Sequence, residues 1–141
     1  MWQGVPKVDI TGITLLGAKA SISAPLELKI FFDLDRDLIA AHWCVKLLVD
    51  SCGKRLVKIL GVTPAEDFTE GNNDMYFAVE LIDVSDIPAS VLANYGLLMA
   101  CLVADGEEVA AVNMVINVTT NNAPLAGGSK VVMREIINPL E

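Results

Sequence analysis

Residues 95–118, with the sequence YGLLMACLVADGEEVAAVNMVINV, decide the fold of this chain. Asp105-Gly106 in the middle is a strong signal for a tight β-hairpin, because both residue types tolerate positive backbone angles. The two flanking runs carry few polar side chains. A two-residue loop pairs Leu97 with Met114, whereas a three-residue loop with a bulge pairs Leu97 with Val115. In both registers each face of the hairpin is largely apolar.

An apolar second face is unusual for such a hairpin, because an antiparallel strand normally puts one face on the core and the other in water. A contiguous exposed apolar surface usually marks an interface. We therefore expect a partner protein to cover the outer face. The alternative is that the C-terminal strand or a short helix of the chain itself covers it.

Further strands are expected on both sides of the hairpin, where runs of Val, Ile, Leu and Phe alternate with turn residues. The expected strands are Val8–Leu16, Leu26–Asp35, Trp43–Asp50, Leu56–Leu60, Met75–Ile82, Tyr95–Ala104, Val109–Val118 and Val131–Ile137. The number and spacing of these segments predict an all-β, antiparallel β-sandwich. In the segment LELKIFFD (26–33), apolar and polar residues alternate at first, so one face of that strand is expected to be wet.

Helical signals are brief. Thr63 followed by Pro64 and Glu66 has the pattern of a capping-box turn. Residues 85–96 begin with a capping Ser85 or Asp86 and end at Gly96, which is enough for one or two helical turns. Residues 119–130 are rich in Asn, Gly and Pro and predict a loop that leads to the last strand.

The chain of 141 residues is expected to form one domain, 1–141. Its net charge of −8, from 18 acidic and 10 basic residues, argues against direct nucleic-acid binding and suits a basic partner. The three cysteines form no C-x-x-C pair, which favours reduced thiols in the cytosol or nucleus. We expect no membrane helix, because Pro88, Asn94 and Gly96 interrupt the one long uncharged run.

Catalytic chemistry is not expected. The single histidine, His42, has no recognisable triad context. A metal shared by His42, Cys44 and Cys52 is disfavoured by their spacing, and residues 33–38 (DLDRDL) lack the glycine of a calcium loop and predict an acidic strand end. The chain is therefore predicted to be a non-enzyme without a cofactor.

Several ordered segments together resemble the anti-silencing-function (Asf) family of histone chaperones. These are KVDITGITLL (7–16), APLELKIFFDLDRDL (24–38), VKLLVDSC (45–52), NNDMYFAVE (72–80), DIP (86–88), the hairpin at Gly106 and VVMREI (131–136). The resemblance implies an immunoglobulin-like sandwich that binds the histone H3/H4 dimer for nucleosome assembly and disassembly. It also implies chromatin-assembly co-chaperones as further partners and a nuclear location, with shuttling through the cytoplasm left open.

The resemblance also implies a partner-binding site. The apolar grip on a helix of histone H3 falls on Leu97 with Tyr95, Met99 and Val115, and Cys52 lies at its rim. Val132 and Met133 lie on the last strand, whose unpaired edge would take the tail of histone H4 as an added strand.

The sequence departs from the family at contact positions. Acidic rim positions fall on Gly53, Lys58 and Val91, a basic contact on Ala111, an aromatic contact on Val115, and the acidic pair that binds co-chaperones on Ala40 and Ala41. Lost charge partners weaken specificity and association rate more than an apolar grip. Two alternatives stay open: an immunoglobulin-like adaptor with a different client, and a sandwich that holds a small apolar ligand between its sheets.

Overall fold

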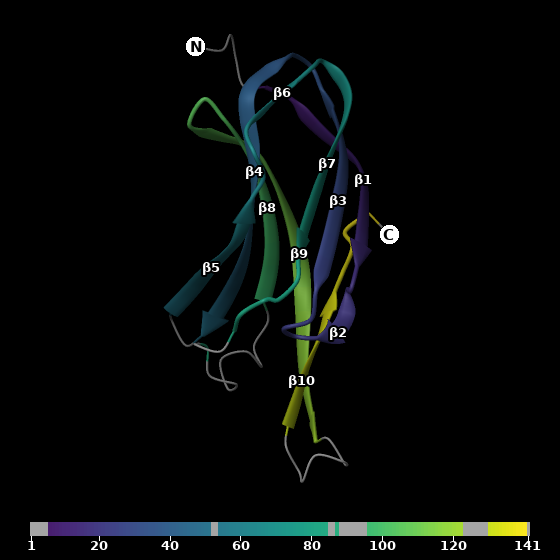
Figure 1. Ribbon diagram of the computed structural model, residues 1–141, viewed down its shortest axis with the longest axis vertical. Helices are drawn as coiled ribbons and strands as arrows, with labels where there is room; N and C mark the ends of the chain where they lie inside the picture. Colours follow the sequence, from purple (N-terminus) through teal and green to yellow (C-terminus); the bar gives the residue numbers. More distant parts are fainter. Residues whose placement is uncertain (1–5, 52–53, 85–86, 88–95, 123–129, 141) are drawn as a thin grey trace.

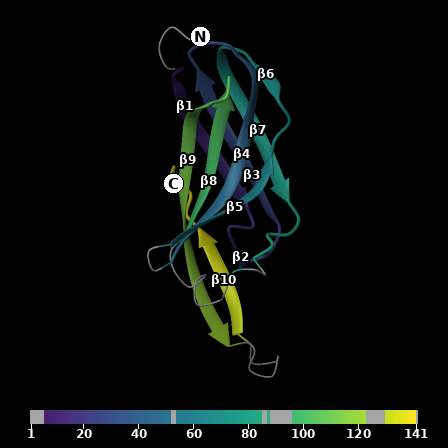
Figure 2. The same ribbon diagram turned by 90° about the vertical axis from the view of Figure 1, so that its left-hand side faces the viewer.

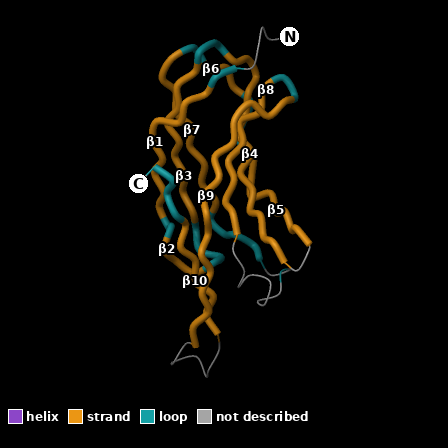
Figure 3. Tube along the Cα trace, turned by 180° about the vertical axis from the view of Figure 1, so that it is seen from behind, coloured by secondary structure: helices purple, strands orange, loops and turns teal. Residues whose placement is uncertain are grey.

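The computed structural model describes residues 6–51, 54–84, 87, 96–122 and 130–140. The strands in these residues are β1 (Val8–Leu16), β2 (Lys19–Ser21), β3 (Leu26–Leu34), β4 (Leu38–Ser51), β5 (Lys54–Val62), β6 (Glu66–Phe68), β7 (Gly71–Val79), β8 (Gly96–Ala104), β9 (Glu107–Asn122) and β10 (Lys130–Ile136). All eight expected strands are present, and β2 and β6 are additional. Figure 3 shows only strands and loops in the described residues. The all-β prediction is therefore confirmed.

The strands form two antiparallel sheets that pack face to face as a sandwich (Figure 1). The smaller sheet has the order β1-β3-β7. The larger sheet has the order β2-β10-β9-β8-β4-β5, and β6 pairs with β4 beside this path. The far ends of β9 and β10 project beyond the rest of the molecule (Figure 1).

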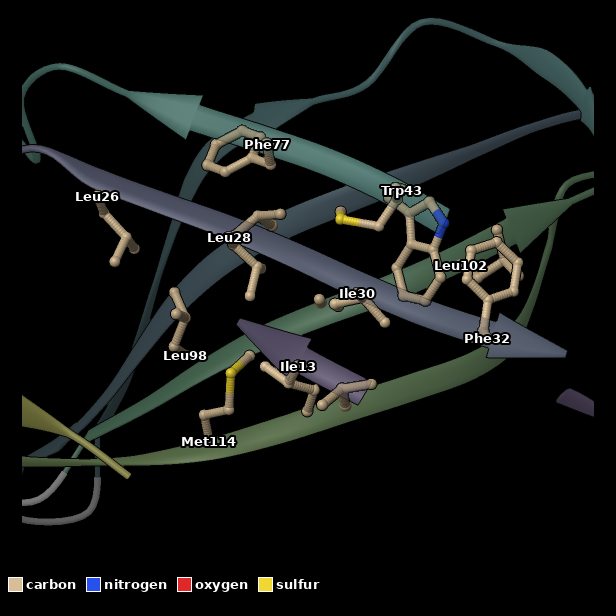
Figure 4. Close-up of a cluster of buried hydrophobic side chains, with 14 of the residues drawn as sticks. Ile13, Leu26, Leu28, Ile30, Phe32, Trp43, Phe77, Leu98, Leu102 and Met114 are labelled. Atoms are coloured by element: carbon tan, nitrogen blue, oxygen red, sulfur yellow. The ribbon is translucent and has the colours of Figure 1, made fainter. Parts of the chain in front are cut away.

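Alternation along the strands fills the space between the sheets. The β3 residues that point inward are Leu26, Leu28, Ile30, Phe32 and Leu34, and none is more than 4% exposed. Figure 4 shows several of these side chains meeting Leu98, Leu102 and Met114 from the larger sheet. On the outer side of β3, Lys29 forms a salt bridge of 3.5 Å with Asp74. One face of this strand is wet, as expected from its pattern.

The expected helical turn at Thr63 is wrong, because Thr63 continues the β ladder. Its backbone N–H donates to the carbonyl of Trp43 at 2.8 Å, and its hydroxyl accepts from the N–H of Trp43 at 2.8 Å. Three residues later β6 pairs with β4, where Asp67 accepts a hydrogen bond from the N–H of Ala40. Ladder bonds to β4 therefore replace the local cap. Most of the second expected helix, residues 85–86 and 88–95, lies outside the described residues.

One buried cation holds the short strand β2 in place. Arg134 on β10 is 3% exposed. Its guanidinium donates to the carbonyls of Gly17 at 2.7 and 3.1 Å, Ile22 at 3.0 Å, Ala24 at 2.9 Å and Pro25 at 2.9 Å. These bonds use all five N–H donors of the side chain. The segment from β1 to β3 is thereby fixed against β10.

Candidate functional site

The hairpin that suggested a partner is formed by β8 and β9. Asp105 and Gly106 have φ angles of 54° and 75°, which a tight two-residue turn with two positive φ angles requires. The register then shifts between Leu102 and Val103, so that Leu97 lies opposite Val115. The observed hairpin thus combines the tight turn of one alternative with the bulged register of the other.

Strands β8 and β9 of the larger sheet lie side by side (Figure 2). Leu97, Met99 and Val115 alternate with inward-pointing core residues along these strands, so they lie on the face of the larger sheet that points away from the smaller sheet. We call this the outer face. Leu97 and Met99 are partly buried, and Val115 is 43% exposed. The C-terminal strand β10 lies beside β9 in the same sheet and so does not cover these side chains. Tyr95 lies outside the described residues.

The outer face extends over β4 and β5, where the sequence analysis assigned no apolar contact. Directly opposite pairs in antiparallel strands share a face. Leu48 lies opposite both Leu97 and Val57. Two further apolar residues of β5, Ile59 and Val62, are 64% and 55% exposed on this side. The signal that could have revealed them is the apolar content of β5 on both faces.

Val132 and Met133 are partly buried neighbours on β10, so their side chains point to opposite faces of the sheet. The expectation of an unpaired edge here is wrong from Met133 to Glu135, because β2 pairs with those residues. The N–H of Ile22 also donates to the carbonyl of Val132 at 3.0 Å. The anchoring of this segment by Arg134 explains why the edge is occupied. Cys52, the expected rim residue, lies outside the described residues.

Two free cysteines, Cys44 on β4 and Cys101 on β8, lie directly opposite each other on adjacent strands and belong to the outer face. Burial raises the pKa of the Cys101 thiol to about 11, and the nearby Glu108 carboxylate acts in the same direction. Cys44 is partly exposed.

We expect iodoacetamide at pH 8 to alkylate Cys44 much faster than Cys101 in the folded protein. The reactive form is the thiolate, and a thiol with a pKa of about 11 is ionised in only about one molecule in a thousand at this pH. Peptide mass spectrometry after timed quenching would measure both rates. The same measurement in urea is the control, in which the difference between the two alkylation rates should be absent. Equal alkylation rates of Cys44 and Cys101 in the native protein would contradict the burial of Cys101.

No metal-binding constellation is found in the described part of the chain. No group of three His, Cys, Asp or Glu side chains there is arranged to hold a metal ion. Acidic residues at the end of β3 instead fix loops: Asp35 accepts from the N–H of Lys7 at 3.0 Å, and Asp37 accepts from the N–H of Glu70 at 2.7 Å. The Arg36 guanidinium beside Asp35 lowers the pKa of that carboxyl. No described helix is long and apolar enough to cross a membrane.

Two hollows lie at the margins of the sandwich. One, of about 530 Å³, is bordered by β1 and the end of β10 and includes the charged side chains Lys19 and Glu135. The other, of about 300 Å³, lies near β6 and β7 and includes Glu66 and Asp74. Both are lined by a mixture of apolar and polar or charged side chains, whereas buried apolar side chains of the described residues fill the space between the two sheets. These features do not favour an apolar guest between the sheets.

Comparison with known proteins adds no assignment. No family model matches the sequence, and no curated protein matches it significantly. What the chain itself defines is an antiparallel β-sandwich with an accessible apolar surface on its larger sheet.

Proposed function

We propose that the chain is a non-enzymatic histone chaperone, an immunoglobulin-like sandwich that binds the histone H3/H4 dimer through its outer face for nucleosome assembly and disassembly. The observation that carries the proposal is the position of Leu97, Met99 and Val115 on one accessible side of the larger sheet. The resemblance of the ordered sequence segments to the Asf family supplies the client. Such a protein would act in the nucleus and hand histones to other assembly factors.

Charge supports the same client. A net charge of −8 attracts a strongly basic partner over distances longer than direct contacts. An apolar helix that docks against Leu97 then supplies short-range affinity, because interface energy is concentrated in a few well-buried anchors. The charge attraction therefore raises the association rate, and the buried apolar contacts lengthen the lifetime of the complex.

A different client of the same fold is the second candidate. It is favoured by Ala111, which is exposed on the outer face where the family has a basic contact, and by Val115 in place of an aromatic residue. An adaptor of this kind would show no preference for histones over other basic proteins.

Titration of the purified chain with the H3/H4 pair, and separately with cytochrome c as another basic protein, tests the proposal. We expect tighter binding to the histones. Leu97→Arg is expected to weaken that binding at least about thirtyfold, roughly 2 kcal/mol, because it places a charge where an apolar side chain should dock.

Leu16→Arg is the matched control, since Leu16 is 57% exposed on β1 of the other sheet. It should change the affinity by less than about twofold. Equal affinity for both basic proteins would overturn the histone assignment. Histone binding unchanged by Leu97→Arg would place the contact elsewhere, provided that circular dichroism shows the variant to be folded.

A further inference from the structure

The apolar side chains of the outer face form a row that runs across the strands. Val57 on β5, Leu48 on β4, Leu97 on β8 and Val115 on β9 lie opposite one another in register. Ile137 continues the row, because its N–H donates to the carbonyl of Val115 at 2.9 Å. Leu48 is only 8% exposed, so the accessible apolar area lies mainly on the residues to either side of it.

The spacing of this row fits an α-helix laid across the strands. Neighbouring strands are about 4.8 Å apart. Helix positions three or four residues apart are about 5–6 Å apart, so each helical turn can place one apolar side chain against one strand. The row of four strands and Ile137 covers about 19 Å, which corresponds to about 13 helical residues. An extended peptide would instead present same-face side chains about 6.8 Å apart, a poorer match.

Two further rows lie beside the apolar row on the outer face, and Lys46 in the first of them is the only charged residue among the positions named in the three rows. The first of these rows consists of Ile59, Lys46, Met99 and Asn113, again directly opposite one another. Lys46 is partly buried between apolar neighbours. No carboxylate of the described residues forms a salt bridge with it. The third row consists of Val62, Cys44, Cys101 and Ala111 and contains no Lys, Arg, Asp or Glu.

A helix that covers the apolar row also removes water from Lys46. An ammonium group that loses its water without gaining an anion weakens the complex, whereas a carboxylate opposite it restores the balance and fixes the position of the helix. The net negative charge of the chain favours a basic client, whereas Lys46 specifies where that client must be acidic.

We infer that the outer face binds an amphipathic helix of about 13 residues that lies across β5, β4, β8, β9 and Ile137 and places an Asp or Glu side chain against Lys46. The identity of the client rests on the proposed function. The placement adds β5 to the binding surface and requires a carboxylate next to the apolar stripe of the helix.

Zero-length cross-linking with a carbodiimide, which joins an amine to a carboxylate in contact, tests the placement on the complex with H3/H4. We expect a cross-link between Lys46 and an Asp or Glu of a histone helix. Lys46→Arg should abolish this cross-link and keep the affinity within about threefold, because it retains the charge without the reactive amine. Lys46→Glu should weaken binding at least about tenfold by placing like charges together.

Lys29→Glu provides the matched control. Lys29 is similarly accessible, with a 43% exposed side chain, but lies on β3 of the smaller sheet. We expect it to leave histone affinity within about twofold. If the wild type binds and Leu97→Arg does not, while Lys46→Glu binds normally and Lys46 forms no cross-link, the placement is refuted and the proposed function stands. If the wild type fails to bind histones, both fall.

Discussion

Replacing Arg134 with alanine is expected to lower the free energy of unfolding by about 3–5 kcal/mol. The guanidinium is 3% exposed and donates five hydrogen bonds to the carbonyls of Gly17, Ile22, Ala24 and Pro25. Its removal leaves these carbonyl groups without their donors at the place where β2 meets β10. Hydrogen bonds from a charged donor contribute more than neutral ones, so several losses at one site produce a large effect.

Burial lowers the pKa of the Arg134 guanidinium from its ordinary value, but the group remains protonated. No carboxylate of the described residues pairs with it. Carbonyl dipoles therefore compensate the charge. Arg134→Lys keeps the charge but offers three donors on a point-like group, so we expect it to recover less than half of the loss.

Urea denaturation followed by circular dichroism measures these changes. The matched control is Lys19→Ala on the neighbouring register position, where Lys19 pairs with Glu135 at 3.3 Å and its side chain is 79% exposed. An exposed pair of this kind contributes at most about 1 kcal/mol. A loss in Arg134→Ala no larger than that in Lys19→Ala would contradict the anchoring role.

The long strands were predictable because apolar and polar residues alternate regularly along them and their inward-pointing side chains are deeply buried. The β1 bounds at Val8 and Leu16 match the expectation, and β3 differs by one residue at its end. β4 begins at Leu38 rather than Trp43, because a bulge with a positive φ of 51° at Ala40 lets the chain continue pairing. Such a bulge has no dependable sequence signature when the residue is alanine.

The missed features depend on tertiary contacts. β2 has three residues and exists through pairing with β10 and the bonds of Arg134, partners more than a hundred residues away in the chain. Thr63 has a good local cap pattern, yet its pairing with Trp43 overrides it. Local propensity is a weak guide wherever a longer-range ladder is available.

The candidate site was predictable on the hairpin but not beyond it. Asp105-Gly106 fixes which two strands pair, and the apolar content of both faces then indicates an interface. The contribution of β5 depends on its position beside β4, and Lys46 becomes relevant only when Ile59 and Met99 are seen on either side of it. Strand order supplies this information, and the sequence of one strand does not contain it.

Replacing Trp43 with alanine is the second change for which we expect a loss of about 3–5 kcal/mol in the free energy of unfolding. Trp43 is fully buried and packs in an edge arrangement against Phe32 (Figure 4), with ring centroids 5.2 Å apart. Phe32 in turn contacts Phe68, with ring centroids 5.3 Å apart. Alanine removes the largest side chain that is fully buried among the described residues and leaves a cavity at the contact between the two sheets.

Trp43→Phe should cost less than half as much, about 1–2 kcal/mol. It keeps an aromatic ring against Phe32 and removes the indole N–H, which is buried without a hydrogen-bond partner among the described residues. An unpaired buried donor is itself unfavourable, so its loss offsets part of the lost volume. Ile39→Ala, at a 71% exposed position of the same strand, is the control and should change stability by less than about 0.5 kcal/mol.

Urea denaturation followed by far-UV circular dichroism avoids the change in fluorescence that loss of a tryptophan causes. Equal losses in Trp43→Phe and Trp43→Ala would show that the ring contact with Phe32 contributes little.

Histone titration of Trp43→Phe adds a second test. Trp43 points to the core, whereas its neighbours Cys44 and Lys46 face outward on the same strand. We therefore expect Trp43→Phe to lose stability and keep its histone affinity, whereas Leu97→Arg should lose affinity and remain folded.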